Sequence, residues 1–196
     1  MGNGMDNFWG SDVGKVALGG AIAIAGQLMV FLLSWGKEHI VAWRKSELEA
    51  QHLGIQLVYV FEKLAGDCYS AVNDHTFTDQ SGRTFNAVDN PELTLPPNGD
   101  YRVLPTAIMY DVMSIPSRLE AIREGLAAMH EFASPPDYSE YYEYRRETLS
   151  RLGLKALELV DALCNKYKFP RPERIEHYDP KEVFLHYVRK SAEVPI

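Results

Sequence analysis

The feature that most constrains this chain is a run of twenty residues without a charged side chain, residues 16–35, VALGGAIAIAGQLMVFLLSW. At a rise of about 1.5 Å per residue, a helix of this length extends about 30 Å, which matches the hydrocarbon core of a bilayer. The run is apolar on all sides, whereas a surface helix of a globular domain is apolar along one stripe. It therefore predicts a single transmembrane helix over residues 16–35.

Three other interpretations of the run fit the residues less well. A buried core helix would be shorter and amphipathic. A cleaved signal peptide needs a basic start, whereas the residues before the run include Asp6 and Asp12. A myristoyl anchor on Gly2 needs Ser or Thr at position 6, where this chain has Asp6.

Cations and tryptophans bracket the run, as expected at the two surfaces of a membrane. The predicted membrane-interface residues are Lys15, Trp35, Lys37, Trp43, Arg44 and Lys45. More basic residues follow the run than precede it, and this bias predicts the orientation. Residues 1–15 are expected to form an extracytoplasmic tail and residues 37–196 a cytoplasmic domain, in a single-pass protein of the inner or plasma membrane.

Small residues recur along the run at the spacing that lets two membrane helices approach closely. The residues predicted to pack in this way are Ala17, Gly19, Ala21, Ala23, Ala25 and, as an amide that seeks a partner in hydrocarbon, Gln27. The pattern favours a homo-oligomer that associates through the span. An alanine-rich helix solvated by lipid is the equally simple alternative.

Behind the run, apolar residues recur in steps of three and four, which indicates buried helix faces. The face of the first helix is predicted to comprise Val41, Leu48, Leu53, Leu57, Val60, Phe61, Leu64, Cys68 and Val72. That of the helix before Pro170 is predicted to comprise Leu149, Leu152, Ala156, Val160, Leu163 and Tyr167. A long first helix can continue from the run, because Gly36 alone separates the two. Alternatively, Ile40, Val41 and Trp43, with the cations around them, can lie flat on anionic lipid headgroups. Residues 73–105 lose this periodicity and contain turn-forming pairs, which predicts a long loop, functional or partly ordered. Residues 83–85 and 101–104 are candidate strands that flank the turn at Asn98.

Three further helices are expected after the loop. The first is interrupted at Pro116 and restarts at Ser117, three residues before a glutamate, as in a capping box. The second opens at Asp137 and ends before Pro170, and the third is a short helix capped by Asp179. The predicted fold class is all-α: a single N-terminal transmembrane helix followed by a small antiparallel helical bundle with one long loop.

Charge and cysteine content make two kinds of protein unexpected: a nucleic-acid binder, and a fold held together by a disulfide framework or a zinc site. The formal net charge is −7, from 27 acidic and 20 basic residues, so a nucleic-acid partner is not expected. The two cysteines, Cys68 and Cys164, stand alone at apolar positions of helical patterns. This predicts reduced, buried thiols, although the sequence leaves a bridge between them open.

No catalytic, cofactor-binding or metal-binding motif is present, and none of the six histidines pairs with another at helical spacing. The most unusual local composition is a tyrosine-rich stretch. Its rings predict a partner surface, or a groove rimmed by carboxylates, and the residues are Tyr138, Tyr141 and Tyr142 with Glu140, Glu143 and Glu147. The alternative is a helix end that packs on the bundle.

Together these patterns favour a membrane-anchored, non-enzymatic interaction protein, an adaptor or sensor without a cofactor. Its expected partners are the lipid bilayer, further copies of itself and an unidentified protein. The alternative function is a membrane-permeabilising effector or gated pore assembled from the single span. A third hypothesis is an enzyme with an unrecognised site in the helical domain.

Overall fold

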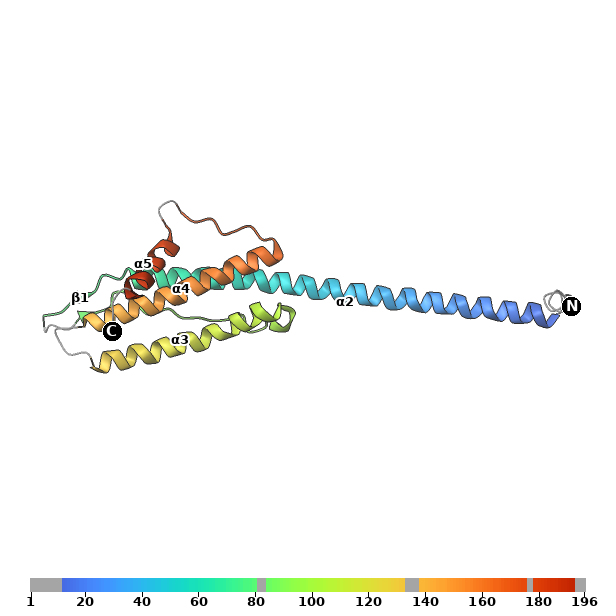
Figure 1. The fold of residues 1–196 in the computed structure, drawn as a ribbon, viewed down its shortest axis with the longest axis horizontal. Helices are drawn as coiled ribbons and strands as arrows, with labels where there is room; N and C mark the ends of the chain where they lie inside the picture. Colours follow the sequence, from blue (N-terminus) through green and yellow to red (C-terminus); the bar gives the residue numbers. More distant parts are fainter. Residues whose placement is uncertain (1–11, 81–83, 133–137, 176–177, 193–196) are drawn as a thin grey trace. The chain divides into compact units, whose positions relative to one another are not determined.

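The structure is a computed structural model that describes residues 12–80, 84–132, 138–175 and 178–192; for residues 12–26 and several positions from 28 to 38 it describes the backbone alone. The elements in chain order are α2 (Asp12–Val72), β1 (Phe77–Thr78), β2 (Thr84–Phe85), the 3₁₀ helix η1 (Tyr101–Val103), α3 (Thr106–Phe132), α4 (Ser139–Tyr167) and α5 (Pro180–Ala192) (Figure 1). Apart from one pair of two-residue strands, the regular structure of the described residues is helical. This confirms the predicted all-α class.

The chain divides into two compact units, residues 1–48 and residues 49–196. In the first unit α2 provides helical backbone from Asp12 onward, and this includes the backbone of the predicted span, residues 16–35. Over the described residues, no helix combines the length and apolarity that crossing a membrane requires. Most side chains of the predicted span lie outside the described residues, so the transmembrane helix stays a prediction.

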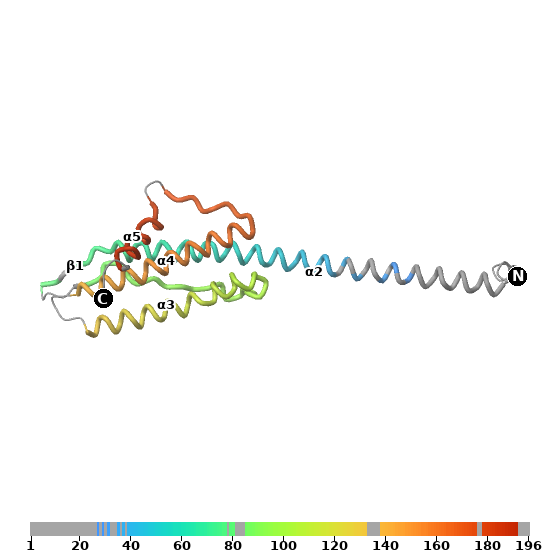
Figure 2. Tube along the Cα trace, in the orientation of Figure 1, coloured from blue at the N-terminus to red at the C-terminus, as the bar shows by residue number. Residues whose placement is uncertain are grey.

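The second unit is a helical bundle built from the C-terminal part of α2 with α3, α4 and α5. Figures 1 and 2 show that α4 runs antiparallel to α3 and to the adjoining part of α2. The C-terminal part of α2 and α3 run in the same direction, because residues 84–105 return along the bundle before α3 begins. The expected antiparallel packing therefore holds for α4 but not for α2 against α3.

One apolar core joins the helices of the second unit. The predicted faces of α2 and α4 both lie in it, with Leu53, Leu57, Phe61, Leu64, Cys68 and Val72 from α2 and Leu149, Leu152, Ala156, Val160, Leu163 and Tyr167 from α4. The predicted face of the first long helix also included Val41 and Leu48, but their side chains are about two-thirds exposed. They precede the bundle, which begins at residue 49.

The long segment between α2 and α3 is an ordered excursion over its described residues. Val88, Leu93, Leu95, Tyr101 and Val103 pack against the core, and Leu104 is buried in it. The predicted pairing of its two candidate strands is wrong. Residues 84–85 pair instead with residues 77–78, and residues 101–103 form a 3₁₀ turn.

The reason for the 3₁₀ turn lies in the residue before it. The Asp100 carboxylate accepts a hydrogen bond from the backbone N–H of Arg102, which stabilises a tight turn in place of an extended strand.

The predicted interruption at Pro116 is also wrong, because α3 is continuous from Thr106 to Phe132. A proline within a helix lacks the N–H that would bond to the carbonyl four residues earlier. Around this position Val112, Ile115 and Leu119 are all buried in the core. Their packing holds the helix together through the lost hydrogen bond.

The helix boundaries near the C-terminus follow the sequence more closely. Asp137 lies outside the described residues, and α4 begins at Ser139 after Tyr138, whose side chain makes no capping hydrogen bond. The Asp179 carboxylate accepts hydrogen bonds from the backbone N–H groups of Lys181 and Glu182, which confirms it as the cap of the last helix.

Candidate functional site

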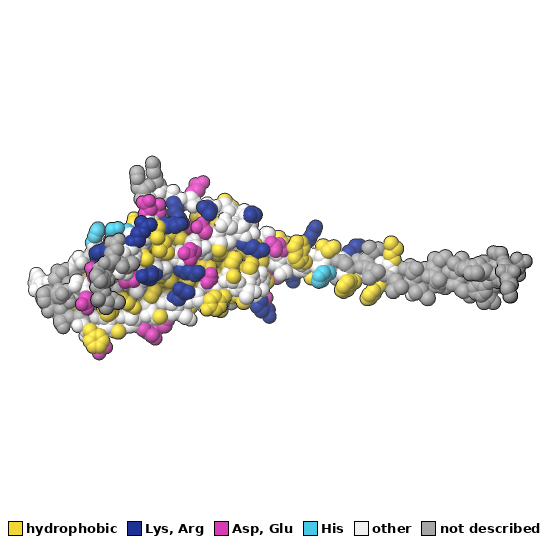
Figure 3. All heavy atoms as spheres, in the orientation of Figure 1, with side chains coloured by type: hydrophobic (Ala, Val, Ile, Leu, Met, Phe, Trp, Pro, Cys, Tyr) yellow, Lys and Arg dark blue, Asp and Glu magenta, His cyan; other side chains and the backbone are white. Residues whose placement is uncertain are grey.

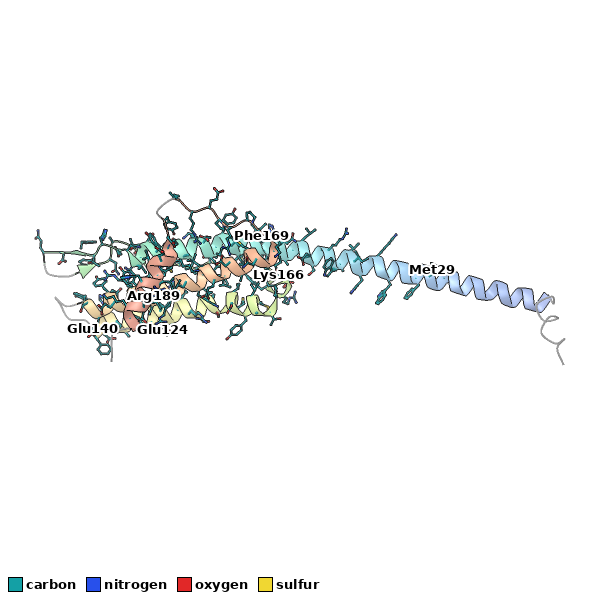
Figure 4. The ribbon with its side chains drawn as sticks, turned by 45° about the horizontal axis from the view of Figure 1, so that its top comes forward. Met29, Glu124, Glu140, Lys166, Phe169 and Arg189 are labelled. Carbon is teal, nitrogen blue, oxygen red and sulfur yellow. The ribbon has the colours of Figure 1, made fainter. Side chains whose placement is uncertain are left out.

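A groove of about 330 Å³ lies in the bundle where the end of α3, the first three turns of α4 and the end of α5 meet. Its volume is at the lower end of the range for ligand sites, which suits a small ligand or one or two side chains of a partner. The lining residues are Met129 from α3, Glu140, Glu143, Tyr144, Arg146 and Glu147 from α4, and Tyr187, Lys190 and Ser191 from α5. Figure 4 labels Glu140 at the N-terminal end of α4 and Arg189 on α5.

The sequence places these helices by two close approaches. Gly153 of α4 lies against the fully buried ring of Phe184, so α5 can rest directly on the backbone of α4. Gly125 of α3 lies in the same way against the ring and hydroxyl of Tyr144. A side chain at either glycine would overlap these rings, so both glycines allow the helices to pack closely.

A second set of contacts fixes the segment between α4 and α5 on the bundle. Arg174 pairs with Glu62 of α2 at 2.8 Å, and the rings of Tyr178 and Tyr69 meet edge to face at 4.9 Å. The start of α5 is therefore tied to α2, and its last turns are left to face the groove.

The charged side chains of the groove differ in whether they have a partner and in how close that partner lies. Lys190 lies 3.8 Å from the Glu143 carboxylate, and Arg146 lies over the Tyr187 ring at 6.0 Å. Glu147 is held by Arg151, one turn further along α4, at 2.9 Å. Within the described residues Glu140 has no cationic partner.

The tyrosine-rich stretch forms an aromatic cluster at the corner between α3 and α4. The His130 ring lies 6.3 Å from Tyr138 and 5.8 Å from Tyr141, and Tyr141 meets Tyr142 edge to face at 5.1 Å. Tyr141 is 7 % exposed, and its hydroxyl accepts a hydrogen bond from Asn86. Burial raises the pKa of Tyr142 above its usual value of 10.0, and the nearby Tyr141 adds to the shift.

These tyrosines do not line the groove, although the three predicted carboxylates do. Among the three tyrosines, Tyr141 is buried and contributes to packing, whereas Tyr138 and Tyr142 are partly exposed. A partner surface on the tyrosines themselves stays a prediction.

Beside the cluster, a buried ion pair joins three parts of the bundle. Arg145 and Asp74 side chains are each 2 % exposed and lie 3.0 Å apart. The Arg145 guanidinium also donates to the carbonyls of Ala71 and Val88 and to the side chain of Asn90. The Asp74 carboxylate accepts from the backbone N–H groups of residues 87 and 88. This network fastens the end of α2 and the long segment to α4.

Sequence reasoning missed this network and the contribution of α5 to the groove. A signal for the network exists: Arg145 stands four residues before Leu149 and so continues the apolar stripe of α4. A charge on such a stripe requires a buried partner. No comparable signal marks Lys190 or Ser191, because the helix that they face depends on how α5 packs on α4, which the local sequence does not determine.

The residues predicted at the membrane fall in the first unit. Ala17, Gly19, Ala21, Ala23 and Ala25, and Lys15 at the interface, lie where the side chains are outside the described residues. The side chains of Gln27, Trp35, Lys37, Trp43, Arg44 and Lys45 are all exposed, and Trp35 stacks on His39 at 6.2 Å. Packing between spans is not tested by this arrangement.

Within the described residues, no three His, Cys, Asp or Glu side chains are grouped so that they could hold a metal ion. The Cys68 and Cys164 thiols are both free and buried there, which confirms the predicted burial of the two side chains. Comparison with protein-family models, with curated proteins and with solved structures finds no match. The features of the chain that bear on its function are the exposed side chains of α2 before the bundle and the groove between α3, α4 and α5.

Proposed function

We propose that this protein is a non-enzymatic interaction protein that is anchored in a membrane by residues 16–35 and presents its helical bundle to a protein partner. The bundle is placed on the cytoplasmic side, with residues 1–15 outside, and copies associate through their spans. The groove between α3, α4 and α5 is its proposed contact site.

One observation carries the membrane part of the proposal. Among the described side chains from residue 27 to residue 48, none is buried. Large apolar side chains are among them, each at least half exposed: Met29, Phe31, Trp35, Ile40, Val41, Trp43 and Leu48. Figure 3 shows hydrophobic side chains standing out along this described part of α2.

A helix with so many exposed apolar side chains is expected to be shielded from water, either by lipid or by another protein surface. The uncharged run on its N-terminal side has the length that lipid requires. Trp35, Trp43 and the cations beside them have the amphipathic side chains that favour a membrane surface. Lipid is therefore the cover that best fits the sequence.

The surface of the bundle supports an interaction role. On the visible face Lys and Arg side chains alternate with Asp and Glu side chains, with apolar side chains between them (Figure 3). Such a mixed surface, with a small groove in it, fits a protein that binds a partner by shape and local charge.

The test is extraction of membranes from cells that make the full-length protein. The native chain should stay in the pellet after an alkaline carbonate wash, which removes peripheral proteins. Replacing Ile22 and Ile24 with arginine places two charges near the middle of the run, at a cost of about 2.5–3.5 kcal/mol each, and should release the protein. Ile40→Arg, on the same helix but beyond the run, is the matched control and should stay in the pellet.

Native protein in the supernatant, or a double arginine variant that stays in the carbonate pellet, would refute the anchor. Dye release from liposomes loaded with the purified protein addresses the alternative of a gated pore. Intact liposomes are expected.

A further inference from the structure

The groove between α3, α4 and α5 has a charge pattern that selects its ligand. Its lining includes the apolar and aromatic side chains of Met129, Tyr144 and Tyr187, and α4 contributes a row of three carboxylates. Glu140 and Glu143 are three residues apart on α4, so their carboxylates lie on one face of the helix. Both residues are exposed, and a ligand in the groove can reach them.

The cations of the groove are already engaged within it. Arg146 faces the Tyr187 ring, and Lys190 is loosely paired with Glu143 at 3.8 Å, with both side chains largely exposed. Glu140 has no cationic partner among the described residues. Three carboxylates against two cations give the groove an excess of negative charge, which disfavours an anionic ligand. A cation would find Glu140 without a cationic partner among the described residues and could displace Lys190 from Glu143.

We propose that this groove binds a basic segment of a partner protein, in which one arginine or lysine side chain lies between Glu140 and Glu143 and its apolar neighbours cover Met129 and Tyr187. An arginine suits the site best, because its planar guanidinium can bond two carboxylates and stack on an aromatic ring. The groove volume of about 330 Å³ fits one such side chain with part of its neighbours and not a whole helix. The inference rests on the proposed function, since it assigns the chemistry of the partner that the anchored bundle meets.

The experiment uses the full-length protein in nonionic detergent micelles and fluorescence anisotropy of a dye-labelled pentapeptide with the central residues leucine, arginine and leucine. Two matched peptides replace the arginine with citrulline, which is neutral and of the same shape, or with glutamate. The arginine peptide should bind several-fold more tightly than the citrulline peptide, and the difference should shrink as salt is added. The glutamate peptide should bind most weakly.

Variants of the protein then separate the groove from the rest of the surface. Glu140→Gln combined with Glu143→Gln should weaken binding of the arginine peptide about fivefold, the effect of losing two exposed charge pairs. Lys190→Gln removes the competing cation and should strengthen binding, a gain that damage to the fold would not produce. Glu158→Gln makes the same change on an exposed part of α4 outside the groove and should leave binding unchanged.

Equal binding of the arginine and citrulline peptides, preference for glutamate, absence of binding, or a Lys190→Gln variant that binds more weakly would each overturn the proposal. The carbonate extraction described above is carried out on the same variants. Peptide binding by a protein that is washed off membranes would refute the anchor alone, and a membrane-held protein that ignores the arginine peptide would refute this inference alone.

Discussion

The buried pair of Arg145 and Asp74 is the residue-level feature on which the bundle most depends. Arg145 lies on α4, Asp74 directly follows α2, and their hydrogen-bond partners lie at the end of α2 and on the long segment. Both charged side chains are buried. Removing one member of a buried pair leaves an uncompensated charge and typically costs about 3–5 kcal/mol. Arg145→Met is therefore expected to lower the free energy of unfolding by about 3–5 kcal/mol in urea denaturation.

Two further variants make this prediction specific. Arg151→Met removes an exposed arginine whose pair with Glu147 is worth about 0.5 kcal/mol or less, and it should change the stability little. Adding Asp74→Asn to Arg145→Met should cost less than the sum of the single changes, because no buried charge then lacks a partner. Strictly additive losses would contradict the coupling of the two residues.

Cys68 predicts how stability depends on pH. Burial, with a smaller contribution from the neighbouring Asp67 carboxylate, raises the pKa of the Cys68 thiol from 9.0 to about 12. The folded protein thus holds this proton more tightly than the unfolded chain does. The associated stability is fully present below about pH 9 and is lost as the pH rises towards 12, at up to about 1.4 kcal/mol per pH unit.

Urea denaturation between about pH 7 and pH 10.5 measures this loss. Cys68→Ala should be less stable at neutral pH because it leaves a cavity, yet its stability should fall less steeply above pH 9 than that of the native chain. Identical slopes would show that the Cys68 thiol does not contribute.

At the scale of the elements, two glycines on helices form a natural comparison. A methyl group at Gly153 would overlap the buried ring of Phe184, so Gly153→Ala should destabilise the protein by about 1–3 kcal/mol. At Gly66 the nearest atom to such a methyl group is the Tyr178 hydroxyl at 3.5 Å, an ordinary contact. Gly66→Ala should therefore stabilise α2 by about 0.5–1 kcal/mol. Thermal unfolding of both variants checks the pair, and an unchanged or raised midpoint for Gly153→Ala would contradict the close approach of α5.

Pro116 gives a second prediction for an element. It lies inside α3, is exposed, and leaves the carbonyl of Val112 without its helical hydrogen bond. Pro116→Ala restores the N–H group, and we expect a gain of about 1–3 kcal/mol, reduced somewhat by the greater freedom of the unfolded chain. Denaturant midpoints measure the gain, and a loss of stability would indicate that the proline ring has a packing role of its own.

The elements also show what could be predicted from the sequence. Within the bundle, the buried faces of α2 and α4 are those that the three- and four-residue spacing of apolar residues predicts. An apolar stripe such as Leu149, Leu152 and Ala156 gives the helix only one side that can be buried. The continuity of α3 through Pro116 could not be predicted, since it depends on core contacts that local propensity does not include. One side of the groove could be predicted, since Glu140, Glu143 and Glu147 share a helix face. The other side could not, because Tyr187 and Lys190 reach the groove only through the packing of α5 on α4.

At the scale of the whole molecule, the two units differ in what holds them together. Every buried core residue belongs to residues 50–184, and the described side chains of residues 27–48 are not buried. The stability of the bundle should then be independent of the first unit. Ser46 and Glu49 have the spacing of a capping box, so a chain that starts at Ser46 can begin α2 with its own N-terminal cap.

We therefore expect a fragment of residues 46–196 to fold with the same cooperative transition as the full-length protein in detergent. Circular dichroism at increasing urea concentration gives both midpoints, and the fragment should bind the arginine peptide as the full-length chain does. The same fragment should be recovered in the supernatant after cell fractionation, because it lacks the uncharged run and, except for Leu48, the exposed apolar residues that follow it. A fragment that aggregates or unfolds at a much lower urea concentration would show that residues 1–45 contribute to the bundle and are not an independent anchor.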